Sequence, residues 1–228
     1  MIRHVLIDEA QDYSLLALYF IHYLYKGSSF TIMADVNQAV VSGTTIHDIS
    51  QFQSIFPEKT TVHALTKSYR SSGPINRLAY KLLGDKQDVS YMEREGEIPK
   101  LIETKDFIGT IEGIVHREKE TKHSIGILVY EKRQAEELYE GLKQKLDLEL
   151  IISAEDELRE NIVIMPVIYA KGLEFDTVIV AGDFKKDFYG VIEKNLLYLM
   201  CTRALHRLYL LSSEEFPGSL SECKDLLQ

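Results

Sequence analysis

The sequence predicts an α/β protein built on a doubly wound, parallel β-sheet. The main observation is an alternation of short apolar stretches with longer amphipathic ones, clearest between residues 106 and 212. Apolar stretches of about four to eight residues are typical of strands buried on both faces, and longer amphipathic stretches are typical of the helices that connect them. Polar clusters also follow two apolar stretches, at residues 8–12 and 35–38. Ligands bind at this end of the strands in open α/β sheets.

Residues 4–12 contain the first predicted strand and the first candidate site. The apolar residues 5–7 are followed directly by Asp8 and Glu9. Asp8, leaving a buried strand, is placed to hold Mg²⁺ against a nucleotide phosphate, and Glu9 could orient and deprotonate an attacking water. The alternative is an ordinary strand that ends in a solvated acidic turn.

The following residues extend this pattern. Residues 13–26 predict a helix that Gly27 terminates, and residues 30–34 predict a second strand. Gln38 follows this strand and could reach a γ-phosphate, although a simple turn between strand and helix is the alternative. Residues 43–60 read as a connecting region, so we expect a domain boundary near its end.

An arginine occupies a suggestive position after the next predicted strand, at residues 61–65. Tyr69 and Arg70 follow this strand, and a helix begins at Pro74. Arg70 is placed to clamp a phosphate, and Tyr69 offers an aromatic face for a base. An ordinary surface arginine is the alternative.

The rest of the chain reads as alternating helices and strands after a polar loop at residues 84–97. We predict helices at residues 106–120, 132–146 and 196–204, and strands at residues 124–130, 148–152, 161–165, 177–181 and 208–212. The last predicted helix is apolar on nearly every side except at Thr202 and Arg203. A buried arginine needs an anionic partner, either a phosphate at a domain interface or a carboxylate of the same domain.

The composition is that of a globular protein, with 45% apolar and 27% charged residues. No apolar run of about 18 residues occurs, so we expect no membrane span, and the N-terminus resembles no signal peptide. Only two cysteines are present, without metal-ligand spacing, which favours a reduced, cytoplasmic setting. The net charge of −9 argues against a general nucleic-acid surface but leaves room for a local groove.

Five segments, in this order, resemble motifs II to VI of the UvrD/Rep-like superfamily 1 DNA helicases. They are Asp-Glu-Ala-Gln-Asp (8–12), Ala-Asp-Val-Asn-Gln (34–38), Lys-Ser-Tyr-Arg-Ser (67–71), Ala-Lys-Gly-Leu-Glu-Phe (170–175) and Cys-Thr-Arg-Ala (201–204). The resemblance implies two RecA-like lobes of the P-loop NTPase fold that bind ATP between them. ATP hydrolysis in such proteins drives movement along single-stranded DNA.

The resemblance also implies a role for each matching residue. In the first lobe these are a Mg²⁺ ligand, a catalytic base and a γ-phosphate sensor, at Asp8, Glu9 and Gln38. In the second lobe Tyr69 matches an adenine-stacking tyrosine and Arg70 a phosphate-binding arginine. Lys171, Gly172 and Glu174 match residues near the γ-phosphate and ribose, and Arg203 matches an arginine finger.

One departure from the family pattern limits what this chain does alone. No Gly-x-x-x-x-Gly-Lys-Ser/Thr phosphate-binding loop occurs in the sequence. The chain therefore resembles the C-terminal part of a longer protein, with residues 1–60 ending a first lobe and residues 61–228 forming the second. The partner of these residues would be the missing N-terminal part of the first lobe. We predict no meaningful ATP hydrolysis by this chain on its own.

Other departures favour the HelD (helicase IV-like) branch of the family. Residues 39–43 lack the aromatic side chains that usually stack on DNA bases, and Pro166 and Ile168 replace the usual threonine and histidine. The interval between Arg70 and Pro166 leaves no room for a large inserted domain. HelD-type proteins act on RNA polymerase, so an ATP-driven polymerase remodeller is one alternative function. A non-catalytic interaction module is a second.

Overall fold

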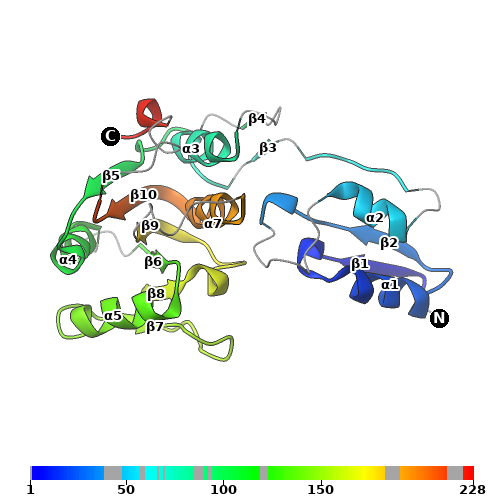
Figure 1. The fold of residues 1–228 in the computed structure, drawn as a ribbon, viewed down its shortest axis with the longest axis horizontal. Helices are drawn as coiled ribbons and strands as arrows, with labels where there is room; N and C mark the ends of the chain where they lie inside the picture. Colours follow the sequence, from blue (N-terminus) through cyan, green and yellow to red (C-terminus); the bar gives the residue numbers. More distant parts are fainter. Residues whose placement is uncertain are drawn as a thin grey trace. The chain divides into compact units, whose positions relative to one another are not determined.

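The computed structural model describes the chain except for residues 1, 39–47, 57–59, 66, 69, 85–89, 92–93, 119–122, 183–190 and 215–222. It divides into two compact units, Met1–Leu65 (unit 1) and Thr66–Gln228 (unit 2). Both units mix helices and strands, as the sequence predicts (Figure 1). Their assignment to two helicase lobes stays a prediction.

Unit 1 contains a pair of parallel strands, β1 (His4–Ile7) and β2 (Ser29–Ile32). Helix α1 (Leu15–Leu24) connects them, and α2 (Ile49–Ile55) lies later in the chain. Ser14 begins α1, because its hydroxyl accepts a hydrogen bond from the Ala17 N–H at 3.1 Å. The core of the unit is small and consists of Ile7, Ala10, Leu18, Phe52, Ile55 and Phe56.

Helix α1 leaves much of its apolar surface exposed. Leu18 is its buried residue, whereas Leu16 is 77% exposed and Tyr23 63% exposed. Tyr19 and Phe20 are exposed as well. A helix that is apolar on all sides is normally buried on all sides, and a parallel sheet is normally covered on both faces. The described residues of unit 1 therefore leave much of the apolar surface of α1 uncovered.

Unit 2 contains a longer set of strands and helices. The strands of its main sheet are β5 (Lys100–Glu103), β6 (Ile125–Val129), β7 (Glu149–Leu150), β8 (Ile162–Pro166), β9 (Phe175–Ala181) and β10 (Ala204–Ser212). Its helices are α3 (Gly73–Leu83), α4 (Phe107–Glu118), α5 (Lys132–Leu142) and α7 (Val191–Cys201). Two short strands, β3 (Lys67–Ser68) and β4 (Ser90–Tyr91), form a separate pair.

Among the described residues, the main sheet has six strands in the order β5-β10-β9-β6-β8-β7, and all neighbours are parallel. This confirms the predicted α/β fold with a parallel sheet. Every residue of β6 and β8 is buried. Strands that are buried on both faces explain why their sequences are continuously apolar rather than alternating.

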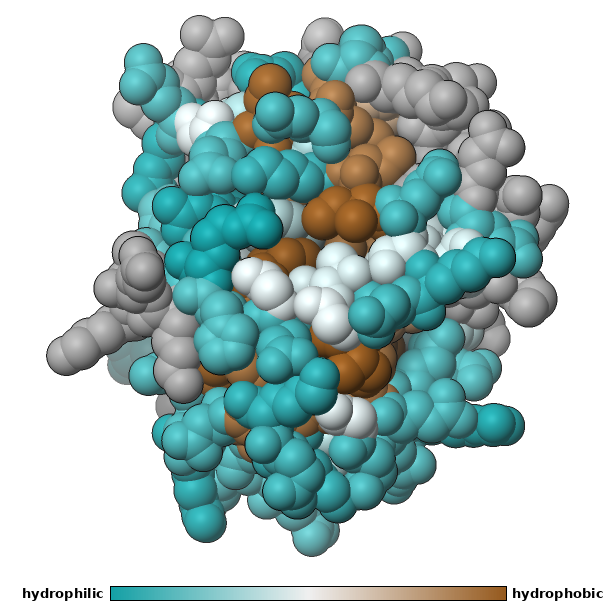
Figure 2. All heavy atoms as spheres, turned by 90° about the vertical axis from the view of Figure 1, so that its left-hand side faces the viewer, coloured by the Kyte–Doolittle hydropathy of each residue, from teal (hydrophilic) through white to brown (hydrophobic). Residues whose placement is uncertain are grey.

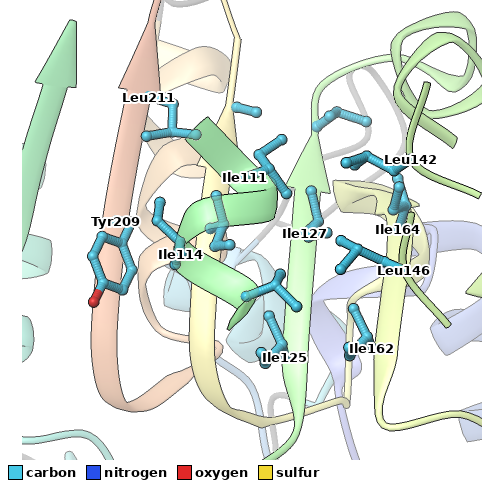
Figure 3. Close-up of a cluster of buried hydrophobic side chains, with 14 of the residues drawn as sticks. Ile111, Ile114, Ile125, Ile127, Leu142, Leu146, Ile162, Ile164, Tyr209 and Leu211 are labelled. Atoms are coloured by element: carbon cyan, nitrogen blue, oxygen red, sulfur yellow. The ribbon is translucent and has the colours of Figure 1, made fainter. Parts of the chain in front are cut away.

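Helices cover both faces of this sheet (Figure 1). Figure 3 shows the core on the α4 and α5 side, where Ile111 and Ile114 of α4 lie near Ile125 and Ile127 of β6. Leu142 of α5 lies near Ile164 of β8 in the same core. Helices α3 and α7 pack against each other and against β9 and β10. On the side of unit 2 that faces the viewer in Figure 2, hydrophilic side chains cover most of the surface and apolar ones show in a strip between them.

The structure corrects several predicted elements. Residues 61–65 are neither strand nor helix, and all five are exposed, so the apolar alternation there reflects no buried pairing. Strand β5 was not predicted, because Lys100 and Glu103 give its four residues a polar character. Helix α7 ends at Cys201, and β10 begins at Ala204, four residues before the predicted start. No helix in the described segments combines the length and apolar character that crossing a bilayer requires.

Candidate functional site

The acidic residues after β1 adopt an unusual backbone conformation. Glu9 has φ 48° and ψ 40°, which lies in the left-handed region that non-glycine residues seldom occupy. Its N–H donates to Asp8 Oδ1 at 2.8 Å, and both side chains are exposed. Backbone strain of this kind is concentrated at functional sites, so it supports a special role for this turn.

A buried glutamine connects this turn to the end of β2. Gln11 is fully buried, and its Nε2 donates to Glu9 Oε2 at 2.5 Å while its Oε1 accepts from the Asp35 N–H at 3.0 Å. Asp35 Oδ2 in turn accepts from Gln38 Nε2 at 2.9 Å. The two polar clusters predicted at neighbouring strand ends are therefore joined, and Gln38 belongs to this network.

Gln11 is a functional candidate that the sequence analysis did not single out. It lies within the Asp-Glu-Ala-Gln-Asp segment, but a glutamine between acidic residues reads as a solvated turn residue. Only the structure reveals it, because the 3-10 turn Ala10–Asp12 buries its side chain and places Oε1 beside the Asp35 N–H, after β2.

The fit of Mg²⁺ to this turn depends on ligands from outside the protein. No group of three or more His, Cys, Asp or Glu residues that could hold a metal occurs in the described ranges. Mg²⁺ in nucleotide-binding proteins usually takes one or two carboxylates, and phosphate oxygens and water complete its shell. The exposed carboxylates of Asp8 and Glu9 fit such a shared site and not an all-protein cage.

The candidate residues of unit 2 come from three separate segments. Arg70 pairs with Glu174 at 2.5 Å between Nε and Oε1, and both side chains are about two-fifths exposed at 44% and 38%. Next to Arg70, the Ser71 hydroxyl donates to the Ala204 carbonyl at 2.6 Å. Tyr69, the predicted adenine-stacking residue, lies outside the described residues.

Gly172 forms the turn that precedes β9. Its φ of +79° requires glycine or strains any other residue, and the Leu173 N–H closes the turn on the Ala170 carbonyl at 3.1 Å. Lys171 is half-buried, and Glu174 is exposed. The predicted cofactor-binding residues Lys171, Gly172 and Glu174 therefore occupy one short turn.

Arg203 lies in a turn after α7 and not on a helix, which corrects the sequence prediction. Its side chain is buried, at 1% exposure. Nε donates to the Leu199 carbonyl and Nη1 to the Leu173 carbonyl, both at 3.3 Å. Carbonyls at a helix C-terminus carry partial negative charge, so they stabilise a buried guanidinium. The predicted need for anionic surroundings is met here in part by the backbone.

These three segments meet at the amino ends of β9 and β10, two interior strands of the main sheet of unit 2. Arg203 contacts the Gly172 turn through Leu173, and Arg70 reaches the same turn through Glu174. The first residues of β9 and β10, Phe175 and Ala204, are paired in register. The candidate residues of unit 2 thus lie at the amino end of these strands, whereas those of unit 1 follow the carboxyl ends of β1 and β2.

Comparison with known proteins supports a helicase relationship for this region. Residues 161–211 match the model of the UvrD-like helicase C-terminal domain. The crystal structure of the C-terminal domain of a possible DNA helicase from Lactobacillus plantarum WCFS1 is similar, with a TM-score of 0.60 and 25% identity, over 71% of this chain and 98% of that one. No curated protein matches significantly.

A second solved structure, that of PRRSV helicase, has a TM-score of 0.51 and 14% identity, and the match covers 92% of this chain and 35% of that one. At this identity the likeness concerns the fold alone. Residues 161–211 therefore resemble the UvrD-like helicase C-terminal domain, and the parallel sheet that contains them is consistent with a RecA-like helicase lobe. The residues that the family model matches include Gly172, Glu174 and Arg203 but none of unit 1.

Proposed function

We propose that this chain is the C-terminal part of an ATP-dependent superfamily 1 DNA helicase or translocase of the cytoplasm. In this proposal ATP hydrolysis drives movement on single-stranded nucleic acid. The observation that carries it is the convergence of Arg70, the Gly172 turn and Arg203 at the amino ends of β9 and β10. Three segments that match helicase motifs in sequence thus also meet in space.

In this function the residues of unit 1 act on the attacking water and the metal. Asp8 would hold Mg²⁺, and the metal would neutralise charge on the phosphates. Glu9 would accept the proton of the water that attacks the γ-phosphate, and ADP would leave as its bond to the γ-phosphorus breaks. Gln38 contacts the γ-phosphate and reports its presence. The exposed carboxylates of Asp8 and Glu9 and the strained turn that presents them support this assignment.

The residues of unit 2 bind the nucleotide and stabilise charge. Arg70 exchanges Glu174 for a phosphate, and Arg203 acts as the arginine finger. The buried guanidinium of Arg203 implies a rearrangement of the turn at Leu173 before it can reach a phosphate. Tyr69 stacks on the adenine, and Lys171, Gly172 and Glu174 line the ribose and γ-phosphate.

Hydrolysis also requires a phosphate-binding loop, which the sequence of this chain lacks. We propose that it is supplied by a preceding part of a longer protein, which also covers the apolar faces of unit 1. The exposure of Leu16, Tyr19, Phe20 and Tyr23 supports this view. The chain alone should turn over no ATP.

A second candidate function is ATP-driven remodelling of RNA polymerase, as in HelD-type proteins. The net charge of −9 favours it, because an acidic chain suits a protein partner at least as well as a DNA track. A non-catalytic interaction module is a third possibility, and the presence of the candidate residues at all five motifs argues against it.

The test is ATPase activity of the longer protein that contains this chain, with single-stranded DNA, with RNA polymerase and with neither. We expect DNA to stimulate turnover and Glu9→Gln to abolish it. Glu136→Gln, an exposed change of the same type on α5, is the matched control and should retain activity. Stimulation by polymerase alone would favour the remodeller. Full activity of Glu9→Gln would refute the assigned base.

A further inference from the structure

Gln11 has no role in the mechanism above, although its environment is exceptional. Among the described residues of unit 1 it is the buried polar side chain, with no exposed surface, and it lies beside the fully buried Ala10. A buried amide is tolerated when both its ends are hydrogen-bonded. Gln11 meets this condition with one partner after β1 and one after β2.

We propose that Gln11 is a positioning residue that couples Glu9 to Gln38. It transmits a change at the acidic turn after β1 to the polar turn after β2. The proposal rests on the proposed function, since Glu9 and Gln38 are there the base and the γ-phosphate sensor. The coupling depends on a continuous path of hydrogen bonds between Glu9 and Gln38, and this path can be tested without nucleotide.

The path has three hydrogen bonds and uses both ends of the Gln11 amide. Gln11 Nε2 donates to Glu9 Oε2, and the Asp35 N–H donates to Gln11 Oε1. Asp35 Oδ2 then accepts from Gln38 Nε2, while Oδ1 accepts from the Asn37 N–H at 3.0 Å. Asp35 thereby fixes the short helix η2 (Val36–Gln38), so a displacement of Asp35 moves the Gln38 side chain.

The Gln11 amide matches both partners of this link. The Glu9 carboxylate requires a donor, and the Asp35 N–H requires an acceptor, so the linking side chain must supply one of each. Glutamate at this position would place a second carboxylate against Glu9 and would lose the donor. Methionine would keep the length and lose both functions. The two substitutions therefore separate the two halves of the link.

The first test is a double-mutant cycle read by NMR, without ligand, on the longer protein that contains this chain. Glu9→Ala removes an exposed side chain and leaves the fold intact. We expect the Asp35 amide proton to exchange about fivefold to tenfold faster, as for the loss of one hydrogen bond, and the Gln38 side-chain amide resonances to shift. In a Gln11→Met or Gln11→Glu background, Glu9→Ala should no longer move the Gln38 resonances.

The matched control is Gln53→Met, an exposed glutamine of α2 in the same unit. In this background Glu9→Ala should have its full effect. The coupling is refuted if Glu9→Ala leaves Asp35 and Gln38 unchanged in the otherwise natural chain. It is equally refuted if the effect on Gln38 persists with methionine at position 11, since the signal would then travel by another route. A merely structural glutamine would lower stability without this dependence.

The second test separates the coupling from the proposed metal site, with Mg²⁺ alone as the probe. In the natural chain Mg²⁺ should shift the amide resonances of Asp8 and Glu9, and those of Asp35 and Gln38 should follow with the same midpoint. With Gln11→Met only the first pair should respond. Equal responses of both pairs in that variant would overturn the coupling and leave the metal site standing. If the amide resonances of Asp8 and Glu9 do not respond to Mg²⁺ alone, the site requires phosphate oxygens as further ligands, and the ligand-free cycle decides the coupling.

Discussion

At Gly126 the ring of a neighbouring phenylalanine leaves no room for any side chain larger than hydrogen. It lies in the central strand β6, and a Cβ added there would meet the ring of Phe175 at 2.5 Å, within a fully buried layer. Phe175 begins β9, directly after the Gly172 turn, so displacement of its ring would disturb the candidate site.

We therefore expect Gly126→Ala to lower the free energy of unfolding by about 1–3 kcal/mol, the usual result of overpacking a core. Urea unfolding of both proteins measures this change. Gly113 provides the control, because it is exposed on α4 with no atom within 4 Å of an added Cβ. Gly113→Ala should stabilise by roughly 0.5–1 kcal/mol, because alanine favours helix. A stable Gly126→Ala protein would show that the ring is free to move.

Asp176 makes unit 2 sensitive to acid. Burial favours its neutral form, but the N–H and hydroxyl of Ser124, each 2.9 Å from Oδ2, outweigh burial and lower the pKa of this carboxyl. A carboxyl whose pKa is lower in the folded state stabilises the protein above its unfolded pKa of about 3.9. This contribution is lost as the pH falls through the lower, folded pKa.

Ser124→Ala removes the hydroxyl donor and should cost about 1 kcal/mol at pH 7. The difference from the natural chain should narrow as the pH falls below about 4 and through the lower, folded pKa, because protonation removes the charge that the hydroxyl stabilises. Urea midpoints at several pH values measure this. In an Asp176→Asn background the effect of Ser124→Ala should not vary with pH. A pH-independent difference in the natural background would contradict the assignment.

At the scale of elements, the sequence predicts the buried strands of unit 2 well and its edges less well. Residues 125–129 and 162–166 are apolar because helices cover both faces of the sheet. The burial of these strands can therefore be predicted from their local sequence. The predicted strand at residues 208–212 begins too late, because Arg207 interrupts the apolar run of β10. Arg207 pairs at 2.7 Å with the buried Glu118 of α4, and Tyr209 donates to the same carboxylate. Such long-range partners leave no local signal.

The candidate site divides in the same way. Asp8, Glu9, Arg70 and the Gly172 turn could be selected from the sequence because each follows or precedes a predicted strand. The burial of Arg203 against backbone carbonyls and the link through Gln11 could not, since they depend on segments distant in the chain.

Arg203 fixes the end of α7 to the turn before β9, so its loss should affect folding as well as function. Arg203→Ala would leave a cavity and would deprive the Leu173 and Leu199 carbonyls of a donor. We expect a loss of about 2–4 kcal/mol in the free energy of unfolding. Arg70→Ala should cost under about 1 kcal/mol, since its ion pair with Glu174 is partly exposed.

Urea unfolding of the two variants beside the natural chain measures this contrast. It also decides how a loss of ATPase activity in Arg203→Ala is interpreted, because an unfolded unit 2 would be inactive whatever the role of the arginine. Equal stability of the Arg203→Ala protein would show that the guanidinium can leave its carbonyl partners at little cost. It would then be free to act on a phosphate.

At the scale of the whole molecule, the two units differ in how far each can sustain its own fold. The described residues of unit 2 form a six-stranded sheet with helices on both faces and a continuous core. Those of unit 1 form two paired strands, a small core and an exposed apolar helix. Two-stranded sheets are only marginally stable in water, and small cores rarely outweigh the conformational entropy of the chain.

Residues 66–228 expressed alone should therefore unfold cooperatively in urea, with a midpoint close to that of unit 2 in the whole chain. Residues 1–65 alone should lack a cooperative transition and should associate through the apolar face of α1. Replacing Leu16 and Tyr23 by lysine should reduce this association without creating a transition, because the change removes exposed apolar surface and adds no core. Circular dichroism and light scattering distinguish these results. A monomeric, cooperatively folded fragment 1–65 would show that unit 1 needs no further covering layer, and the proposal that a preceding segment packs on it would fall.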